Sequence, residues 1–229
     1  MNPKKIVIAI DGPAASGKST TAKLVAERLG YLHIDTGAMY RAITLKVVEE
    51  RIPLEAIDRI QALAEQTSIR LERRNGHQRV FLDGRDVTEA IRSPEVTKHV
   101  SLISSYPQVR TVMVREQRRM AEAGGVVLEG RDIGTVVLPY ADLKIYMTAD
   151  VGERARRRKK ELEQAGVGVD EEALRAEIEE RDRRDSTRTT SPLRKAPDAI
   201  VLDTSNMTVE QQVEFIVQRA NEIIERKTD

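Results

Sequence analysis

The sequence predicts an α/β fold in which helices flank a parallel sheet of five strands. Five apolar segments of strand length are separated by helical segments and lie near residues 6, 32, 127, 145 and 201. Strands that alternate with helices assemble into parallel sheets through right-handed crossovers. A second observation is that residues 69–73 and 79–82 flank Asn75-Gly76, a favoured pair for a hairpin turn. This antiparallel patch interrupts the alternation and predicts an inserted lobe with a small antiparallel sheet.

The amino-acid composition limits the classes of protein to which the chain can belong. The chain has 229 residues, enough for one α/β domain with inserted lobes, and no cysteine, so disulfides and thiolate metal sites are excluded. Its 38 basic and 37 acidic side chains leave a net charge of +1, and aromatic residues make up only 3%. Binding to a nucleic-acid polymer or to a membrane is therefore not expected. The first apolar run is too short for a signal peptide or a membrane span, and we expect a cytoplasmic protein.

One motif organises the chain, the segment Gly12-Pro13-Ala14-Ala15-Ser16-Gly17-Lys18-Ser19 between the first strand and the first helix. It fits the P-loop pattern, in which successive backbone N–H groups curl around phosphate oxygens and glycines leave room for them. Lys18 can reach the β- and γ-phosphates, Ser19 can bind Mg²⁺, and the helix that starts near Lys18 points its positive end at the anion. An ordinary glycine-rich turn is the alternative, but strand, loop and helix signals in register favour a phosphate site.

The remaining elements follow from apolar spacing and capping residues. Strands are predicted over residues 4–10, 31–34, 126–128, 143–147 and 199–202. Helices are predicted over residues 20–29, 38–51, 53–67, 108–123, 153–163 and 170–184, with Gly30 and Asp170 as caps. A closing helix follows a capping box of Thr208 and Gln211, and its buried stripe is Val213, Ile216, Val217, Ala220 and Ile224. The basic run over residues 154–160 is typical of a solvated helix face or, beside a P-loop, of arginines that neutralise phosphate charge.

Three further segments carry a resemblance to a known family: residues 35–41 (Asp-Thr-Gly-Ala-Met-Tyr-Arg), 129–135 (Glu-Gly-Arg-Asp-Ile-Gly-Thr) and 181–188 (Arg-Asp-Arg-Arg-Asp-Ser-Thr-Arg). Together with the P-loop they resemble the bacterial cytidylate kinases, nucleoside monophosphate kinases of the P-loop NTPase superfamily, over nearly the whole chain. The resemblance implies the reaction ATP + CMP ⇌ ADP + CDP, with dCMP as a second acceptor, Mg²⁺ as cofactor and a monomeric state. It also implies a P-loop core (1–32, 110–153 and 168–229), a monophosphate-binding lobe (33–109) and a helical lid (154–167).

The resemblance assigns a role to each candidate site residue. The ATP phosphates would be bound by the P-loop together with Thr20 and the lid arginines Arg154, Arg157 and Arg158. The CMP phosphate would be held by Thr36, Arg41, Arg131 and Arg188, the base by Ser101, Arg110 and Asp132, and the ribose side by Arg181 and Asp185. A phosphate acceptor needs no general base, so catalysis reduces to alignment and charge neutralisation. The catalytic cations would be Lys18, Arg41, Arg131 and Arg188.

Hydrogen-bond polarity explains how cytosine could be selected. Cytosine offers an amino donor and two acceptors, which a carboxylate such as Asp132 and a guanidinium such as Arg110 match. Uracil reverses the polarity at N3 and position 4, and an unmade or repulsive buried contact costs about 1–3 kcal/mol or more. Two positions depart from the family pattern. Thr36 stands where many relatives have serine and keeps the hydroxyl, whereas Glu129 stands where aspartate is common, which leaves its role toward Mg²⁺-bound water open.

Two rival functions fit parts of the sequence. The first is a P-loop kinase for another small acceptor, which an acceptor screen would separate from a cytidylate kinase. The second is a nucleotide-dependent RNA-binding switch that contacts RNA through the basic stretch near residue 157, but the low net charge and few aromatic residues disfavour it.

Each arginine alone is typical of a surface ion pair. His33, His77 and His99 lack ligand spacing and are typical of packing or surface positions.

Overall fold

A computed structural model describes residues 5–74, 77–164 and 166–228 of the chain. The chain forms two compact units, one from residues 1–33 and 124–229 and the other from residues 34–123. Residues 110–123, which the sequence-based division assigned to the core, cluster with the second unit. The division into core, substrate lobe and lid concerns function and stays a prediction.

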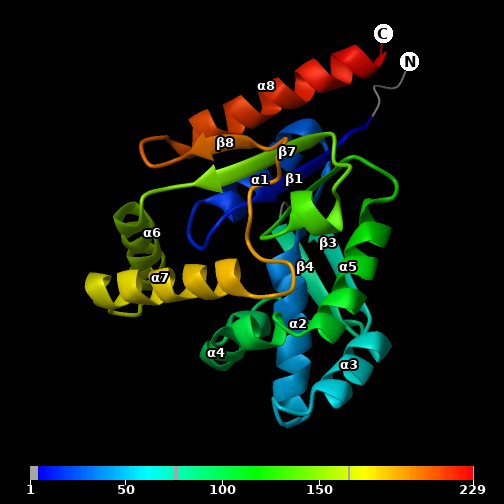
Figure 1. The fold of residues 1–229 in the computed structure, drawn as a ribbon, viewed down its shortest axis with the longest axis vertical. Helices are drawn as coiled ribbons and strands as arrows, with labels where there is room; N and C mark the ends of the chain where they lie inside the picture. Colours follow the sequence, from blue (N-terminus) through cyan, green and yellow to red (C-terminus); the bar gives the residue numbers. More distant parts are fainter. Residues whose placement is uncertain (1–4, 75–76, 165, 229) are drawn as a thin grey trace. The chain divides into compact units, whose positions relative to one another are not determined.

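The first unit is built on a five-stranded sheet in the order β2-β6-β1-β7-β8, of which Figure 1 labels β1, β7 and β8. The strands are β1 (Val7–Asp11), β2 (Leu32–Asp35), β6 (Val126–Gly130), β7 (Leu143–Thr148) and β8 (Ile200–Asp203). The central strand β1 pairs in parallel with β6 and β7, and β7 pairs in parallel with β8. A strand in the middle of such a sheet is covered on both faces, which explains the unbroken apolar run before the P-loop. Because parallel strands end at the same edge, the segments after β1 and β6 meet there.

The core of this unit lies between the sheet and two helices. The helices α1 (Lys18–Leu29) and α8 (Val209–Thr228) pack on the face that Ile6, Ile8 and Ile10 line (Figure 1). Alternate residues of a strand point to the same face, so these three isoleucines form one apolar stripe. In the predicted stripe of α8, Val213, Ile216, Val217 and Ala220 are buried, and Ile224 is half-buried against the same core.

Capping residues set the ends of the helices as the sequence predicts. The Gln211 side chain accepts the Thr208 N–H at 2.9 Å, and the Thr208 hydroxyl accepts the Gln211 N–H at 3.2 Å, which confirms the capping box. Gly30 ends α1 in the left-handed conformation with a φ of 68°. The helices α6 (Val151–Gln164) and α7 (Glu171–Thr187) pack on each other, and Asp170 caps α7 by accepting the Ala173 N–H at 2.9 Å.

The second unit combines four helices with an antiparallel sheet. Its helices are α2 (Thr36–Glu49), α3 (Ile57–Gln66), α4 (Pro94–Ile103) and α5 (Pro107–Ala121), together with a 3-10 turn over Ala90–Arg92. Its strands are β3 (Ile69–Arg74), β4 (His77–Leu82) and β5 (Arg85–Asp86), in the order β3-β4-β5. The antiparallel pairing of β3 with β4 confirms the predicted patch. The predicted turn Asn75-Gly76 lies outside the described residues.

Some elements differ from the prediction. The helix α4 was not predicted, although the Ser93 hydroxyl accepts the Val96 N–H at 3.4 Å and Pro94 occupies the first turn. The helix α2 begins at Thr36 rather than Ala38 because the Asp35 carboxylate accepts the Ala38 N–H at 3.0 Å. A π-helical turn over Ile133–Val137 was also not predicted.

Candidate active site

The P-loop between β1 and α1 has the backbone shape that an anion site requires. Gly12 has a φ of 153°, and a Cβ there would lie 2.1 Å from the Met147 carbonyl oxygen, so only glycine fits. Gly17 precedes α1 with a φ of 91°, and Ala15 adopts a φ of 56°. Backbone N–H groups in such alternating conformations form a concave anion-binding nest, and the positive end of α1 opens onto it. This geometry is that of a phosphate-binding loop.

Lys18 lies inside this loop. Its Nζ donates to the Pro13 carbonyl oxygen at 2.6 Å and to the Ser16 hydroxyl at 3.2 Å. Burial, followed by the positive charge of Arg131, lowers the pKa of Lys18 to about 7. An anion bound beside Lys18 would favour the charged form and raise this pKa again.

Asp11 connects the P-loop strand to the turn after β6. The two oxygens of its carboxylate accept the backbone N–H groups of Ile133 and Gly134, each at 2.7 Å. Burial raises the pKa of Asp11 to about 6, against the two hydrogen bonds, which lower it. The next residue back along the turn is Asp132, which is buried. The backbone at Asp132 is therefore held by a residue of the P-loop strand.

Arg154 on α6 also contacts the P-loop. Its Nη1 donates to the Ala14 carbonyl oxygen at 3.1 Å and to Asp182 Oδ2 at 2.5 Å, while its Nε donates to the Ala149 carbonyl oxygen at 3.1 Å. Asp182 Oδ1 accepts the Ala14 N–H at 3.4 Å. Asp182 thus accepts the Ala14 N–H and Arg154 donates to the Ala14 carbonyl, so together they hold one residue of the phosphate loop.

The other two predicted lid arginines have different surroundings. Arg157 donates to the Thr204 carbonyl oxygen at 2.6 Å and to Glu153 at 3.0 Å. The Thr204 hydroxyl in turn donates to the Ser16 carbonyl oxygen at 3.1 Å, so Arg157 reaches the P-loop through one residue. Arg158 pairs with Glu161 at 3.0 Å on an exposed part of α6.

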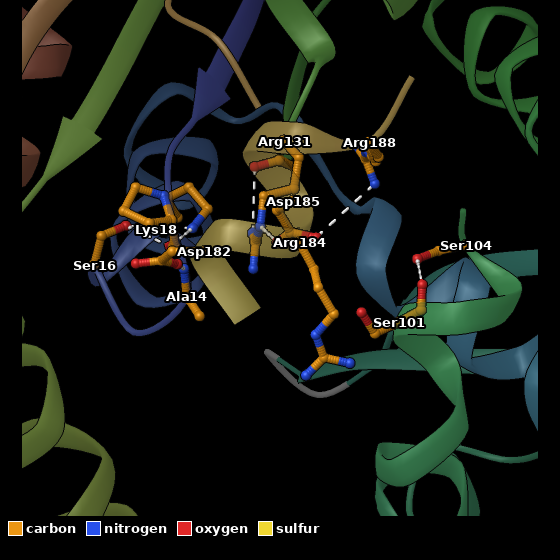
Figure 2. Close-up of polar contacts among 12 residues, drawn as sticks. Ala14, Ser16, Lys18, Ser101, Ser104, Arg131, Asp182, Arg184, Asp185 and Arg188 are labelled. Carbon is orange, nitrogen blue, oxygen red and sulfur yellow. Dashed lines mark hydrogen bonds and ion pairs between the residues drawn. The ribbon is translucent and has the colours of Figure 1, made fainter. Parts of the chain in front are cut away.

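Guanidinium groups from two segments converge on Asp185 of α7. Arg131 Nε donates to Asp185 Oδ2 at 2.8 Å, and Arg188 Nη1 lies 4.0 Å from Asp185 Oδ1 (Figure 2). Burial works to raise the pKa of Asp185, but the charges of Arg131, Arg181 and Arg188 hold it below its usual value. Like charges gather in this way only when anions lie between them, and guanidinium groups bind phosphate strongly. The predicted residues Arg131, Arg181, Asp185 and Arg188 are thus brought together.

Ser19 lies at the end of a series of polar side-chain contacts. The Ser19 hydroxyl donates to Glu129 Oε2 at 2.7 Å, and His33 Nε2 lies 3.0 Å from Glu129 Oε1. Glu129 is buried, and Ser19 is exposed. Hydroxyl and carboxylate oxygens are the ligands that Mg²⁺ prefers. Within the described part of the chain, no three His, Cys, Asp or Glu side chains gather as a metal site.

The remaining predicted residues lie in the second unit. Arg41 on α2 donates to Thr97 Oγ1 at 2.9 Å, and Thr36 is buried at the start of that helix. Ser101 on α4 accepts the Ser104 hydroxyl on its carbonyl at 3.1 Å (Figure 2), and Arg110 Nη1 donates to the Ser104 carbonyl oxygen at 3.1 Å. Ser101 and Arg110 are therefore linked through Ser104.

Sequence reasoning missed several residues that hold these groups. Asp182 lies within a segment that the resemblance singled out, yet no role was assigned to it. His33 was expected to be a packing or surface residue, whereas its Nε2 contacts a buried carboxylate beside the P-loop. Asp11 ends the first apolar run, and a charged residue at that position was the available signal.

A parallel α/β sheet with this loop, a buried lysine and converging guanidinium groups defines a phosphotransferase of the P-loop class. A model of the cytidylate kinase family matches residues 8–222, and the chain belongs to that family. It is 51% identical over 212 residues to the cytidylate kinase of Enterococcus faecalis, which covers 93% of this chain and 94% of that one. It is 54% identical over 215 residues to the cytidylate kinase of Pelotomaculum thermopropionicum, covering 93% and 95%. The predicted family is confirmed.

A solved structure supports the fold. The chain is similar to an uncharacterized protein from Eubacterium ventriosum with a TM-score of 0.50 and 14% identity, over 95% of this chain and 99% of that one. At this identity the likeness concerns the fold alone. None of the helices in the described ranges has the length and apolar content that crossing a membrane requires.

Proposed function

We propose that this chain transfers the γ-phosphoryl group of ATP to CMP and to dCMP, forming ADP and CDP or dCDP. The observation that carries the proposal is the occurrence of a P-loop and a guanidinium cluster in a chain about half identical to cytidylate kinases. A phosphate oxygen of the acceptor bonds to the γ-phosphorus while the bond from that phosphorus to the β-phosphate oxygen breaks. The acceptor oxygen is already ionised, so no side chain has to remove a proton.

On the donor side, residues 12–20 bind the ATP phosphates through backbone N–H groups, and Lys18 neutralises the charge of the β- and γ-phosphates. Arg154 and Arg157 are suited to assist because one contacts the P-loop directly and the other does so through Thr204. Arg158 is assigned to the same phosphates on the family resemblance, and its exposed pairing with Glu161 suits only a weak contact.

On the acceptor side, Arg131 and Arg188 bind the CMP phosphate together with Thr36 and Arg41 of the second unit. Their proposed task is to hold one phosphate against another while negative charge shifts to the leaving oxygen. Arg181 and Asp185 contact the ribose. In this role Asp185 both keeps the guanidinium groups in place and accepts a sugar hydroxyl.

The base is read by Ser101, Arg110 and Asp132. Asp132 accepts the amino hydrogens of cytosine, whereas uracil would place an oxygen opposite that carboxylate. The buried position of Asp132 supports this role because solvent cannot compensate an unmade contact there. Fixing of the adjacent turn by Asp11 limits how far Asp132 can move to avoid uracil.

Mg²⁺ fits the chemistry of the Ser19 region, where a hydroxyl and a buried carboxylate oxygen lie 2.7 Å apart. The ion supplies charge neutralisation between the β- and γ-phosphates when it is bound with ATP. Ser19 would be its direct protein ligand, and Glu129 would orient Ser19 and bound water. We further propose a monomer that acts in the cytoplasm, with core, substrate lobe and lid divided as the sequence analysis expects.

The test is a screen of nucleoside monophosphates with ATP and Mg²⁺, followed by coupled detection of ADP. CMP and dCMP should be phosphorylated at least about tenfold faster than UMP or AMP, because one lost buried contact is worth about 1–3 kcal/mol. Faster turnover of UMP or AMP than of CMP would overturn the assignment. Replacing Asp132 by Ala should reduce CMP use far more than ATP binding, and equal losses would show that Asp132 does not read the base.

A further inference from the structure

Three side chains form a continuous series of contacts from β2 through β6 to the start of α1. His33 lies on β2, Glu129 on β6 and Ser19 in the first turn of α1. His33 Nε2 is 3.0 Å from Glu129 Oε1, and Ser19 Oγ is 2.7 Å from Glu129 Oε2. The sheet order makes β2 and β6 neighbours, and β6 is the neighbour of β1, from which the P-loop leaves. We call this set the His33–Glu129–Ser19 chain.

The proton positions in this chain follow from its hydrogen bonds. The Ser19 hydroxyl donates to Glu129 Oε2, and His33 Nε2 lies within hydrogen-bond distance of Glu129 Oε1. An ionised carboxylate only accepts hydrogen bonds. The Ser19 hydroxyl therefore directs its hydrogen at Oε2, and the His33 ring carries a hydrogen on Nε2 that faces Oε1. The oxygen lone pairs of Ser19 are consequently turned away from Glu129.

The two contacts of Glu129 depend on each other. A glutamate side chain is one methylene longer than aspartate, about 1.5 Å of added reach, and it has one more rotatable bond. Without a partner on Oε1, the carboxylate of Glu129 could rotate and withdraw Oε2 from Ser19. His33 removes that freedom because it holds the far oxygen. The longer side chain of Glu129 and the histidine at position 33 thus belong to one arrangement.

We propose that His33 is a positioning residue for the Mg²⁺ site, a role that rests on the proposed function of Ser19 as the metal ligand. By holding Glu129, His33 keeps the Ser19 hydroxyl hydrogen on the carboxylate and the Ser19 oxygen turned toward the metal. His33 itself does not touch the ion. Partners that orient a ligand in this way are typically worth 10–100-fold in metal affinity.

The experiment measures how much Mg²⁺ strengthens ADP binding. Isothermal titration gives the ADP affinity in excess Mg²⁺ and in excess EDTA, and the ratio of the two is the metal enhancement. His33→Leu removes the hydrogen-bond donor to Glu129. His33→Asn keeps a polar side chain but places its amide near the position of Nδ1. His33→Gln places an amide N–H near the position of Nε2. The matched control is His99→Leu, which changes a histidine of α4 in the second unit.

We expect His33→Leu and His33→Asn to lower the metal enhancement about tenfold while the affinity measured in EDTA changes less than twofold. His33→Gln should retain most of the enhancement, and His99→Leu should retain all of it. The concentration of Mg²⁺ that gives half-maximal activity should rise in the first two variants, with kcat restored at high Mg²⁺.

Three outcomes would contradict the proposal in distinguishable ways. Equal loss of affinity with and without metal would mean that His33 only supports the nucleotide pocket. Unchanged enhancement in His33→Asn, or loss of it in His33→Gln, would mean that the hydrogen bond to Glu129 does not act on the metal. If the wild-type protein bound ADP equally well with and without Mg²⁺, the proposed role of Ser19 would be wrong, and the role of His33 would fall with it.

Discussion

Arginines of α6 and arginines around α7 are used in opposite ways, although both sets lie in densely charged sequence. On α6, Arg154 points to two backbone carbonyl groups and to Asp182, and Arg157 points to the carbonyl of Thr204 and to Glu153. The guanidinium groups of Arg154 and Arg157 diverge: Arg154 pairs with Asp182, whereas Arg157 shares Glu153 with the exposed Arg156. Arg154 and Arg157 hold the P-loop and its neighbours in place.

Around α7 the guanidinium groups converge. Arg131 and Arg188 both contact Asp185, and Arg181 adds its charge to the same carboxylate. Like charges brought to one point repel, and a second anion such as a phosphate relieves that repulsion. The density of arginines along a sequence therefore does not locate an anion site. What distinguishes Asp185 is that arginines converge on a buried carboxylate, because the more exposed Glu153 and Glu180 also pair with two arginines each.

The largest effect should follow from removing a converging arginine. Arg131→Met removes a cation from the acceptor side and leaves a buried carboxylate with one partner fewer. We expect kcat/KM for CMP to fall about 10³-fold, as for other arginines that stabilise phosphoryl transfer. The matched control is Arg175→Met, which changes an exposed arginine of the same helix α7 that pairs with Glu179. A loss below tenfold at Arg131 would remove the distinction between the two sets.

A diverging arginine should instead affect stability and the donor site. Arg154→Met leaves Asp182 and the Ala14 carbonyl without the guanidinium, and breaking a buried pair of this kind costs about 3 kcal/mol of unfolding free energy. Urea denaturation measures this loss, and KM for ATP should rise more than KM for CMP. The double variant Arg154→Met with Asp182→Leu should regain part of the stability. A stable single variant with impaired CMP binding would contradict the structural role.

Lys18 lies in the P-loop beside Pro13 and Ser16, and its contribution to the unfolding free energy should depend on pH. Its pKa is lowered to about 7 in the folded chain, so between pH 7 and about 10 the unfolded chain binds the extra proton and the folded chain does not. The unfolding free energy therefore falls as pH falls through this window, by at most about 1.4 kcal/mol per pH unit, and levels off below pH 7. Lys18→Met lacks this slope.

Denaturation of both proteins from pH 6 to pH 9.5 checks this expectation. As pH decreases toward 7, the unfolding free energy of Lys18→Met should rise relative to that of the wild type by about 1 kcal/mol per pH unit. Below pH 7 the difference between the two proteins should stay constant. A difference that is independent of pH would show that burial and Arg131 do not depress the Lys18 pKa.

The smallest effect is expected at Arg158. Its guanidinium is exposed and pairs with Glu161, so a contact with ATP phosphate would be screened and worth less than about 1 kcal/mol. Arg158→Met should raise KM for ATP about threefold and change the unfolding free energy by less than about 0.5 kcal/mol. A rise in KM for ATP above about thirtyfold would mean that Arg158 contributes to ATP binding as strongly as the buried arginines. An unchanged KM would mean that Arg158 forms only a surface ion pair.

Much of the fold was predictable because its signals are local. The parallel strands, the capping box at Thr208 and the cap of α7 each depend on a few neighbouring residues, and all are confirmed. The helix α4 was missed although its capping serine and first-turn proline are present in the sequence. The π-helical turn over Ile133–Val137 could not be predicted, since it depends on Asp11 at the end of another strand.

The sequence alone determined the phosphate loop, the alternation of strands and helices and the family, because each is encoded in short runs whose spacing carries the meaning. Only the tertiary structure decided which charged groups meet. Arg131 and Asp185 are 54 positions apart, and Glu129 lies 96 positions from His33 and 110 from Ser19. The order of strands in the sheet joins such residues, and that order results from packing of the whole core rather than from the residues next to any one of them.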